Sequence, residues 1–330
     1  MGIKRPIGII TGFLLICNAF AQDFHFSQFM QNMVYVNPAY AALPTSGEAG
    51  LTYRNQWPGI PATFVTYGAA LVMPVKMLNG GVGVHFINDM QGSGVIIRTI
   101  ASLQYGYRIS LNAEWSICTG LGASYVLKKF NAAELVFRSD ILNDLGYGTG
   151  TVTFDNYNRT YADFNAGIIA TNNNNLSFGF SASHLTRPHD TFSNQVGSRM
   201  PIKYTGFVSG RLDANGVAVE PAVYYSQQQN NNELVWGSQF VIGSTFMAGG
   251  FLRQNLRFNP DALIIVAGIS WENYNIAYSY DVNLKKMRFL STKMAAHEVT
   301  FLYRFEYKQE NIKTGQRHKQ SKKVECPAYL

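Results

Sequence analysis

The sequence is poor in charged residues and, after its first 21 residues, lacks any long apolar run. Charged residues make up 14% of the chain, whereas an average soluble domain holds about one quarter. No uncharged apolar run after residue 21 reaches the roughly 18 residues that a membrane-spanning helix needs. A helical membrane protein is therefore disfavoured, and the membrane class that remains is the β-barrel.

Cysteine is scarce as well. Once a leader is removed, the chain keeps only Cys118, in a predicted wall strand, and Cys326, in the carboxyl-terminal tail. A disulfide needs Cα atoms within about 7 Å of each other. We therefore expect no disulfide between these two residues.

Motifs for catalysis, phosphate binding or metal binding are also missing. The six histidines show no zinc-site spacing, and there is no glycine-rich phosphate motif. Ser183 and His184 are adjacent in a predicted strand, where neighbours point to opposite faces, so they are not expected to act together. His184 and His189 fit an interfacial girdle and its loop better than a metal site shared with Asp190. We predict a non-enzymatic protein without cofactor or metal.

The net charge of +7 does not indicate a nucleic-acid partner, because the excess lies at the two ends of the chain. Lys4 and Arg5 belong to the predicted leader. The tail after Tyr307 carries six basic and two acidic residues. The body between them is close to neutral and offers no basic groove.

The stretch from Trp115 to Lys128 is the clearest structural signal. Its alternate positions form one apolar set and one small or polar set, broken only by Val126, which is the pattern of a strand with two unlike faces. The stretch exceeds the roughly five or six residues of an average soluble strand, and a strand crossing a bilayer needs about nine to eleven. We predict a transmembrane strand whose apolar set, including Leu121, faces lipid and whose small set, including Gly120, faces the lumen.

About fourteen such segments follow one another from Ala49, an even number typical of bacterial barrels. The fold class we predict is all-β, a transmembrane antiparallel outer-membrane barrel over residues 49–307. The segments lie near 49–57, 62–73, 81–89, 95–108, 114–128, 160–170, 175–186, 202–212, 216–227, 233–242, 244–254, 262–271, 273–281 and 297–307.

The connections between these segments alternate in length almost throughout, although Pro74–Gly80 is longer than a tight turn and Asp89–Gly94 is a short loop. In bacterial barrels periplasmic turns are short and extracellular loops are longer. The predicted turns are Ile109–Ala113, Thr171–Asn175, Asp213–Asn215 and Ile242–Ser244, and the predicted long loops are Phe130–Arg159, Arg187–Pro201 and Asp281–Ala296. This alternation indicates a barrel with both termini on the periplasmic side.

Residues 1–21 are typical of a secretory signal peptide. Lys4 and Arg5 precede an apolar run from Ile7 to Ile16, and Ala19-Phe20-Ala21 is a small-x-small cleavage site. The run is too short to span a membrane. Cleavage would leave Gln22 as the first mature residue.

Residues 22–48 do not alternate, but they are rich in aromatic side chains. Five aromatics exposed to solvent would be costly, so we predict a periplasmic segment or, preferably, a plug that packs into the barrel at its inner mouth. The candidate partner-binding residues in this segment are Gln22, Asp23, Phe24, Phe26, Phe29, Asn37 and Pro38.

The tail, residues 308–330, has too few apolar residues to fold alone. It is either a solvated end or a basic periplasmic strap for a partner. The return of apolar residues at its end favours the strap slightly. The candidate partner-binding residues here are Lys313, Arg317, Lys319, Lys322, Lys323, Cys326 and Pro327.

An ordered set of short motifs resembles the PorP/SprF family. The motifs are Gln22-Asp23 with Phe26-Ser27-Gln28-Phe29, Asn37-Pro38-Ala39, Tyr53-Arg54-Asn55-Gln56-Trp57, Tyr278-Ser279-Tyr280-Asp281, His297-Glu298 and Cys326-Pro327. They cover nearly the whole mature chain in the family's order, although residues 132–195 carry little that matches.

The resemblance implies an outer-membrane protein of the type IX secretion and gliding machinery of the Bacteroidota. Its expected partners are periplasmic ring lipoproteins, other secretion proteins and a large surface adhesin, within outer-membrane lipid. We predict a barrel that anchors such lipoproteins or supports export and attachment of the adhesin. The alternative is a diffusion channel or a transporter of hydrophobic substrates, which should conduct or import when purified alone.

Overall fold

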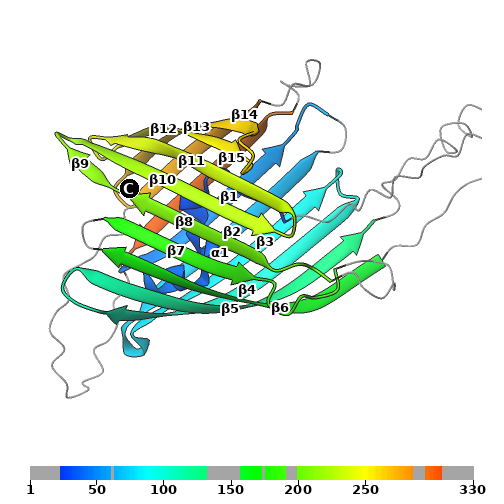
Figure 1. The fold of residues 1–330 in the computed structure, drawn as a ribbon, viewed down its shortest axis with the longest axis horizontal. Helices are drawn as coiled ribbons and strands as arrows, with labels where there is room; N and C mark the ends of the chain where they lie inside the picture. The colour runs from blue at the N-terminus through cyan, green and yellow to red at the C-terminus, as the bar shows by residue number, and fades with distance from the viewer. Residues whose placement is uncertain are drawn as a thin grey trace, which may run out of the picture.

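The computed structural model describes residues 23–60, 63–131, 157–172, 175–190, 199–284 and 294–306. Long strands wrap around a common axis and enclose a short helical segment (Figure 1). The strands are β1 (Gly47–Gln56), β2 (Phe64–Val75), β3 (Gly80–Gln91), β4 (Ile96–Ser110), β5 (Trp115–Phe130), β6 (Tyr157–Asn172), β7 (Leu176–Ser183), β8 (Lys203–Gly210), β9 (Leu212–Ala214), β10 (Val217–Gln228), β11 (Asn231–Ile242), β12 (Phe246–Gln254), β13 (Pro260–Trp271), β14 (Tyr274–Asn283) and β15 (Ala296–Phe305).

The wall is a closed antiparallel ring. Strands pair with their neighbours in chain order, except that β8 and β9 both pair with β10, which also pairs with β11. The ring closes where β1 pairs with β15 across ten residue pairs, from Gly47↔Phe305 to Gln56↔Ala296. β8 and β9 lie on β10 in one continuous register, with Ser209 opposite Ala222 and Leu212 opposite Val219. They therefore form one wall strand interrupted at Arg211, and the prediction of a barrel of about fourteen strands is confirmed.

The two faces of the predicted strand at Trp115–Lys128 are confirmed. In β5 the side chains of Leu121 and Tyr125 are 68% and 59% exposed on the outside of the barrel. Cys118 is fully buried on the inside, and Val126, the apolar exception in the small set, is buried there too. The same alternation places Asn275 of β14 in the lumen.

Connection length separates the two ends of the barrel. One end, which we call the loop end, carries the connections 131–156, 184–202 and 284–295. The other, the turn end, carries only the short connections 76–79, 111–114, 173–175, 215–216, 243–245 and 272–273, and the β9–β10 hairpin marks it at the left of Figure 1. At the loop end the connections 92–95, 229–230 and 255–259 are also short, so the alternation has exceptions there.

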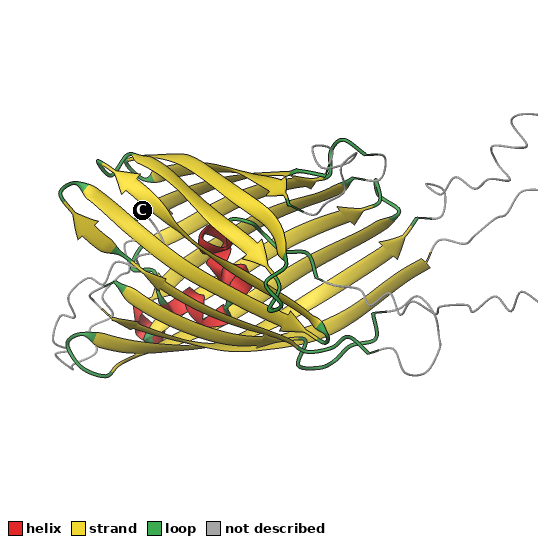
Figure 2. Cartoon of the chain, turned by 45° about the horizontal axis from the view of Figure 1, so that its top comes forward, coloured by secondary structure: helices red, strands yellow, loops and turns green. Residues whose placement is uncertain are grey.

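The lumen holds three short helical turns, enclosed by the strands in Figure 2. They are η1 (Phe29–Asn32), α1 (Met33–Val36) and η2 (Pro38–Ala42), and a further turn, η3 (Lys76–Leu78), connects β2 to β3. The larger of two buried apolar clusters among the described residues joins η1, α1 and η2 to inward side chains such as Ile169, Phe207 and Ile264. Among the described residues, no helix is long and apolar enough to cross a membrane.

Candidate functional site

Residues 23–46, which we call the lumen segment, run through the barrel from the loop end to the turn end. Asp23 contacts Arg98, near the loop end of β4. Farther along, Ala42 packs against Gly106, near the turn end of the same strand. The segment then enters β1 at Gly47. It therefore spans the lumen instead of sitting only at the inner mouth, where we had expected a plug.

The helical turns of the lumen segment form where local sequence favours them. Pro38 is at the first helical position of η2, where its missing N–H costs nothing. Asn37 caps this helix by accepting a hydrogen bond from the Ala39 amide at 2.9 Å. The Asn37 side-chain amide also donates to the carbonyls of Ile168 and Phe180, at 3.1 Å each. One side chain thus starts η2 and fixes it to β6 and β7.

Glycines in the wall admit the lumen segment at close range. An ideal Cβ placed on Gly106 would lie 2.6 Å from the backbone nitrogen of Ala42, a separation that real Cβ atoms do not reach. A Cβ on Gly120 would collide with the backbone of Ala39. Small inward residues therefore make the space that η2 occupies.

A buried polar group, the seam cluster, lies where β1 and β15 close the ring. It consists of Ser27 and Gln28 from the lumen segment, Arg54 from β1, Asp281 from β14 and Glu298 from β15. The Ser27 and Gln28 amides donate to the Glu298 carboxylate at 2.7 and 3.0 Å. Arg54 pairs with Glu298 and with Asp281, both at 3.0 Å. Two strands of the seam and the segment inside are therefore tied by one ionic network.

The seam cluster is shielded from solvent. The side chains of Arg54 and Glu298 are 2% and 0% exposed. Arg253, from β12, adds a second cation 3.1 Å from Asp281 and also pairs with Asp261 at 3.0 Å. Buried charges persist only when they are paired and hydrogen-bonded, and here the lumen segment supplies part of that pairing.

A second group, the His184 cluster, holds the start of the lumen segment at the loop end. It contains Asp23, Arg98, Asp163 and His184. Arg98 pairs with one oxygen of Asp23 at 2.6 Å, and His184 Nε2 lies 2.6 Å from the other. His184 Nδ1 lies 2.6 Å from Asp163. The histidine therefore bridges a carboxylate of the segment to a carboxylate of β6.

The His184 cluster is built for a charged imidazole. Burial opposes protonation of His184, but the Asp23 charge and the hydrogen bonds to Asp163 and Asp23 outweigh it and raise its pKa to about 9. Burial also works against the Asp23 carboxylate, yet His184 and Arg98 hold the pKa of Asp23 well below its usual value. At neutral pH the imidazole of His184 therefore carries a positive charge next to the Asp23 carboxylate.

The wall also satisfies the main chain of the lumen segment. Besides the two amides that Glu298 accepts, the Gln228 side chain accepts the Asp23 amide at 3.2 Å. Gln104 donates to the Val34 carbonyl at 2.8 Å, and Ser181 donates to the Val36 carbonyl at 2.7 Å. Side chains from four different wall strands thus replace the backbone partners that this segment cannot supply itself.

Aromatic packing completes the contact. Phe29 lies with its ring centre 5.0 Å from that of Tyr224 and 6.0 Å from that of Phe251, both on the inner wall. Phe24 stacks on Tyr35 at 5.0 Å, and Phe26 meets Tyr35 edge-on at 5.5 Å. These separations are those of favourable aromatic pairs.

The predicted partner-binding residues divide into two groups. Asp23, Phe24, Phe26, Phe29, Asn37 and Pro38 all lie in the lumen and contact the wall. Gln22, Lys313, Arg317, Lys319, Lys322, Lys323, Cys326 and Pro327 lie outside the described residues. Binding of a separate partner by either group stays a prediction, as does the absence of a Cys118–Cys326 disulfide.

The assignment of His184 to an interfacial girdle is wrong. β7 ends at Ser183, and His184 has a positive φ of 62°, so the strand alternation that pointed its side chain outward stops one residue earlier. Sequence reasoning also missed Arg98, Asp163 and Arg253 as parts of the site. Their signal was available, because each is a charged residue at an inward position of a wall strand.

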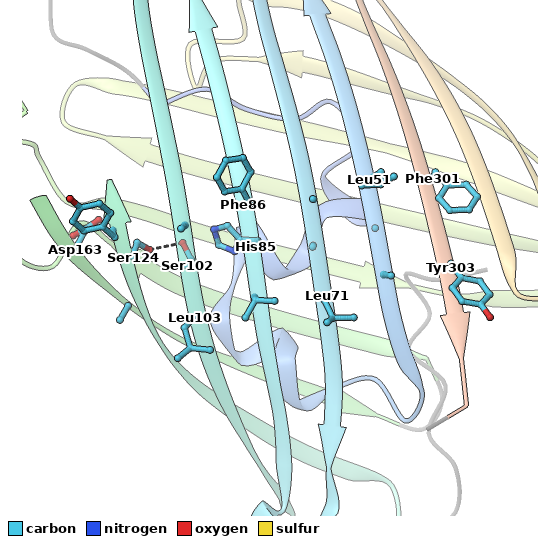
Figure 3. Close-up of a pocket in the computed structure, with 18 of the residues that line it drawn as sticks. Leu51, Leu71, His85, Phe86, Ser102, Leu103, Ser124, Asp163, Phe301 and Tyr303 are labelled. Carbon is cyan, nitrogen blue, oxygen red and sulfur yellow. Dashed lines mark hydrogen bonds between the residues drawn. The ribbon is translucent and has the colours of Figure 1, made fainter. Parts of the chain in front are cut away.

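A separate apolar groove of about 1070 Å³ lies on the outer face of the wall, over the seam and the strands beside it (Figure 3). Leu51, Phe86 and Leu103 line it and are exposed. Phe301, on the far side of the seam, completes that side of the groove. Its outward lining is apolar, as expected of a surface that faces lipid.

The described residues contain no group of three or more histidine, cysteine or acidic side chains arranged to hold a metal ion. In the seam cluster and the His184 cluster, the charged side chains are instead paired with one another or with the lumen segment. The arrangement can therefore hold a polypeptide and close the lumen.

Comparisons with known proteins agree with this architecture. The family model described as type IX secretion system membrane protein PorP/SprF matches residues 18–303. No curated protein matches the chain closely enough to count as a relative. Among solved structures, the Ralstonia pickettii toluene transporter TbuX has a TM-score of 0.52 and 11% identity, covering 83% of this chain and 93% of its own. The CymD monoaromatic hydrocarbon channel has a TM-score of 0.48 and 12% identity, covering 86% and 94%. At such identities the first likeness shows the fold alone.

Proposed function

Because this chain belongs to the PorP/SprF family of type IX secretion system membrane proteins, we propose that it is a non-enzymatic anchor and assembly partner in that machinery. In this role the barrel sits in the outer membrane and holds periplasmic ring lipoproteins, or supports export and surface attachment of a large adhesin. The observation that carries the proposal is the family match over residues 18–303.

The filled lumen supports an anchor more than an open pore. Helical turns η1, α1 and η2 are buried inside the wall, and the seam cluster and the His184 cluster tie the segment to both sides of the barrel. An open diffusion channel would be favoured by steady conductance of the purified wild-type barrel in a planar bilayer. An anchor should be silent in that measurement.

The proposed partner-binding arm is the tail, residues 308–330. β15 ends at Phe305 at the turn end, the end that faces the periplasm in bacterial barrels. The amino-terminal side differs, because Asp23 lies in the lumen near the loop end. We therefore retain a periplasmic terminus for the tail, and we propose that residues 1–21 are removed as a signal peptide.

Co-purification from the native outer membrane tests this function. The full chain, extracted in gentle detergent, should bring down stoichiometric periplasmic lipoproteins or a giant adhesin, identified by mass spectrometry. A chain truncated after Tyr307 should fold equally well and bring down less of these partners. Recovery of the full-length barrel alone would contradict the anchor, and an unchanged yield of partners after truncation would remove the tail from it.

A further inference from the structure

We propose that the lumen is a polypeptide-binding site, in which residues 23–43 act as an exchangeable occupant that a partner segment of the same chemistry can replace. Such a segment begins with an acidic residue, continues with a stretch rich in aromatic residues, and offers main-chain N–H and C=O groups to the wall. This inference goes beyond the secretion role and does not depend on it, because it concerns the barrel alone.

The lumen segment has no fold of its own. Its helical turns are four, four and five residues long, whereas isolated helices below about 12 to 15 residues are marginal in water. Its turns are held in place by the wall. The segment is thus bound in the manner of a peptide ligand rather than packed as a separate domain.

The wall contacts the main chain of this segment at five points. Glu298 accepts two consecutive amides, Gln228 accepts a third, and Gln104 and Ser181 donate to two carbonyls. Such contacts hold any polypeptide that follows the same path, because every residue other than proline offers the same N–H and C=O groups.

Two pockets add selectivity to this main-chain recognition. Arg98 and His184 together bind one carboxylate, that of Asp23. Tyr224 and Phe251 receive the Phe29 ring. A replacement segment must therefore bring an acidic side chain and an aromatic side chain at a matching spacing.

The connection of the segment to the wall permits exchange. The segment is outside the strand ladder, since the ring closes by pairing β1 directly with β15. It joins β1 through Pro44, Thr45 and Ser46 at the turn end, where Thr45 is exposed. It can therefore leave without breaking a strand pair.

Simple loss of the segment is costly. Glu298 would lose both amides and Arg98 would lose its Asp23 partner, leaving lumen charges less well paired. Replacement by a second segment restores these contacts. The site should therefore exchange occupants rather than stand empty.

The experiment uses the full chain, with a protease cleavage sequence inserted at Thr45 and with Cys326→Ser, so that Cys118 is the only thiol of the mature protein. The barrel is folded and purified in detergent before cleavage, so folding does not limit the result. A fluorescent synthetic peptide of residues 23–43 is then added in excess. Bound peptide is measured by size exclusion, and access to buried Cys118 is measured by maleimide labelling.

We expect the labelled peptide to co-elute with the cleaved barrel at one copy per barrel, and Cys118 to become labelled faster during exchange. A scrambled peptide of the same composition should not enter. A day of incubation with no incorporation and with Cys118 still protected would overturn the proposal, since the segment would then be a permanent part of the core.

A backbone-modified peptide separates main-chain recognition from simple trapping. Replacing the amide of Gln28 by an ester removes one of the N–H groups that Glu298 accepts and leaves the wall unchanged. A hydrogen bond to a charged group is worth enough to weaken binding about tenfold or more. An ester peptide that binds as tightly as the amide peptide would refute recognition through the main chain.

Discussion

Removal of Arg54 should destabilise the barrel more than loss of an exposed ion pair. The Arg54 side chain is 2% exposed and lies 3.0 Å from both Glu298 and Asp281. Removing one partner of a buried ion pair costs about 3–5 kcal/mol, because the other charge stays buried. We expect Arg54→Ala to fall toward the lower part of that range, since Asp281 keeps Arg253 as a second cation.

The measurement is urea unfolding of the barrel in lipid vesicles, followed by tryptophan fluorescence. Asp213→Ala is the matched control, because the Asp213 side chain is 58% exposed in its pair with Arg211, and exposed pairs contribute about 1 kcal/mol or less. The destabilisation of Arg54→Lys should lie between those of the two variants, since lysine keeps the positive charge but cannot contact Glu298 and Asp281 with two separate nitrogens. If the free energy of unfolding of Arg54→Ala lies within about 1 kcal/mol of the wild-type value, the view that this cluster stabilises the seam is refuted.

Three further predictions concern the wall, the lumen and the His184 cluster. Leu121→Arg should cost about 2–4 kcal/mol and lower the folded fraction seen by heat-dependent gel mobility, with Leu121→Met as control; normal folding would show that the faces are reversed. In Gly106→Val the added side chain should displace η2 and increase the rate of maleimide labelling of Cys118. An unchanged labelling rate would show that the wall strand moves and η2 stays in place. Because the pKa of His184 is raised from 6.5 to about 9, its contribution to stability is complete below pH 6.5 and is lost as pH rises through about 9. In His184→Gln the free energy of unfolding should change less between these pH values than in the wild type. An equal pH dependence in both proteins would contradict a stabilising ion pair between His184 and the carboxylates of Asp23 and Asp163.

The wall could be predicted from the sequence because its signal is local. Alternation along Trp115–Lys128 already separates Leu121 from Cys118, and both lie on the expected faces. The interruption at Arg211 could not be predicted from the sequence. β8 and β9 pair with β10 in one continuous register, as a single uninterrupted strand would. Boundaries shifted by a few residues, as at β6, which begins at Tyr157 instead of near residue 160.

The site could be predicted only in part because its signal is not local. The aromatic content of residues 22–48 indicated a packed segment, but its partners are remote in sequence. Ser27 and Glu298 are separated by 271 positions, and no periodicity connects them. His184 was misplaced because a positive φ follows the last residue of β7, and that backbone change leaves no trace in the alternation of polar and apolar residues.

The seam cluster also imposes an order on how the molecule becomes complete. Ser27 and Gln28 are among the first residues that the structure describes, whereas Asp281 and Glu298 are among the last. The start of the chain can reach its final partners only after nearly all of the chain exists. A chain that stops before β14 and β15 leaves Arg54 and both amides without their carboxylates. The hydrogen bonds and ion pairs of the seam cluster can therefore form only when the chain is nearly complete and β14 and β15 are in place.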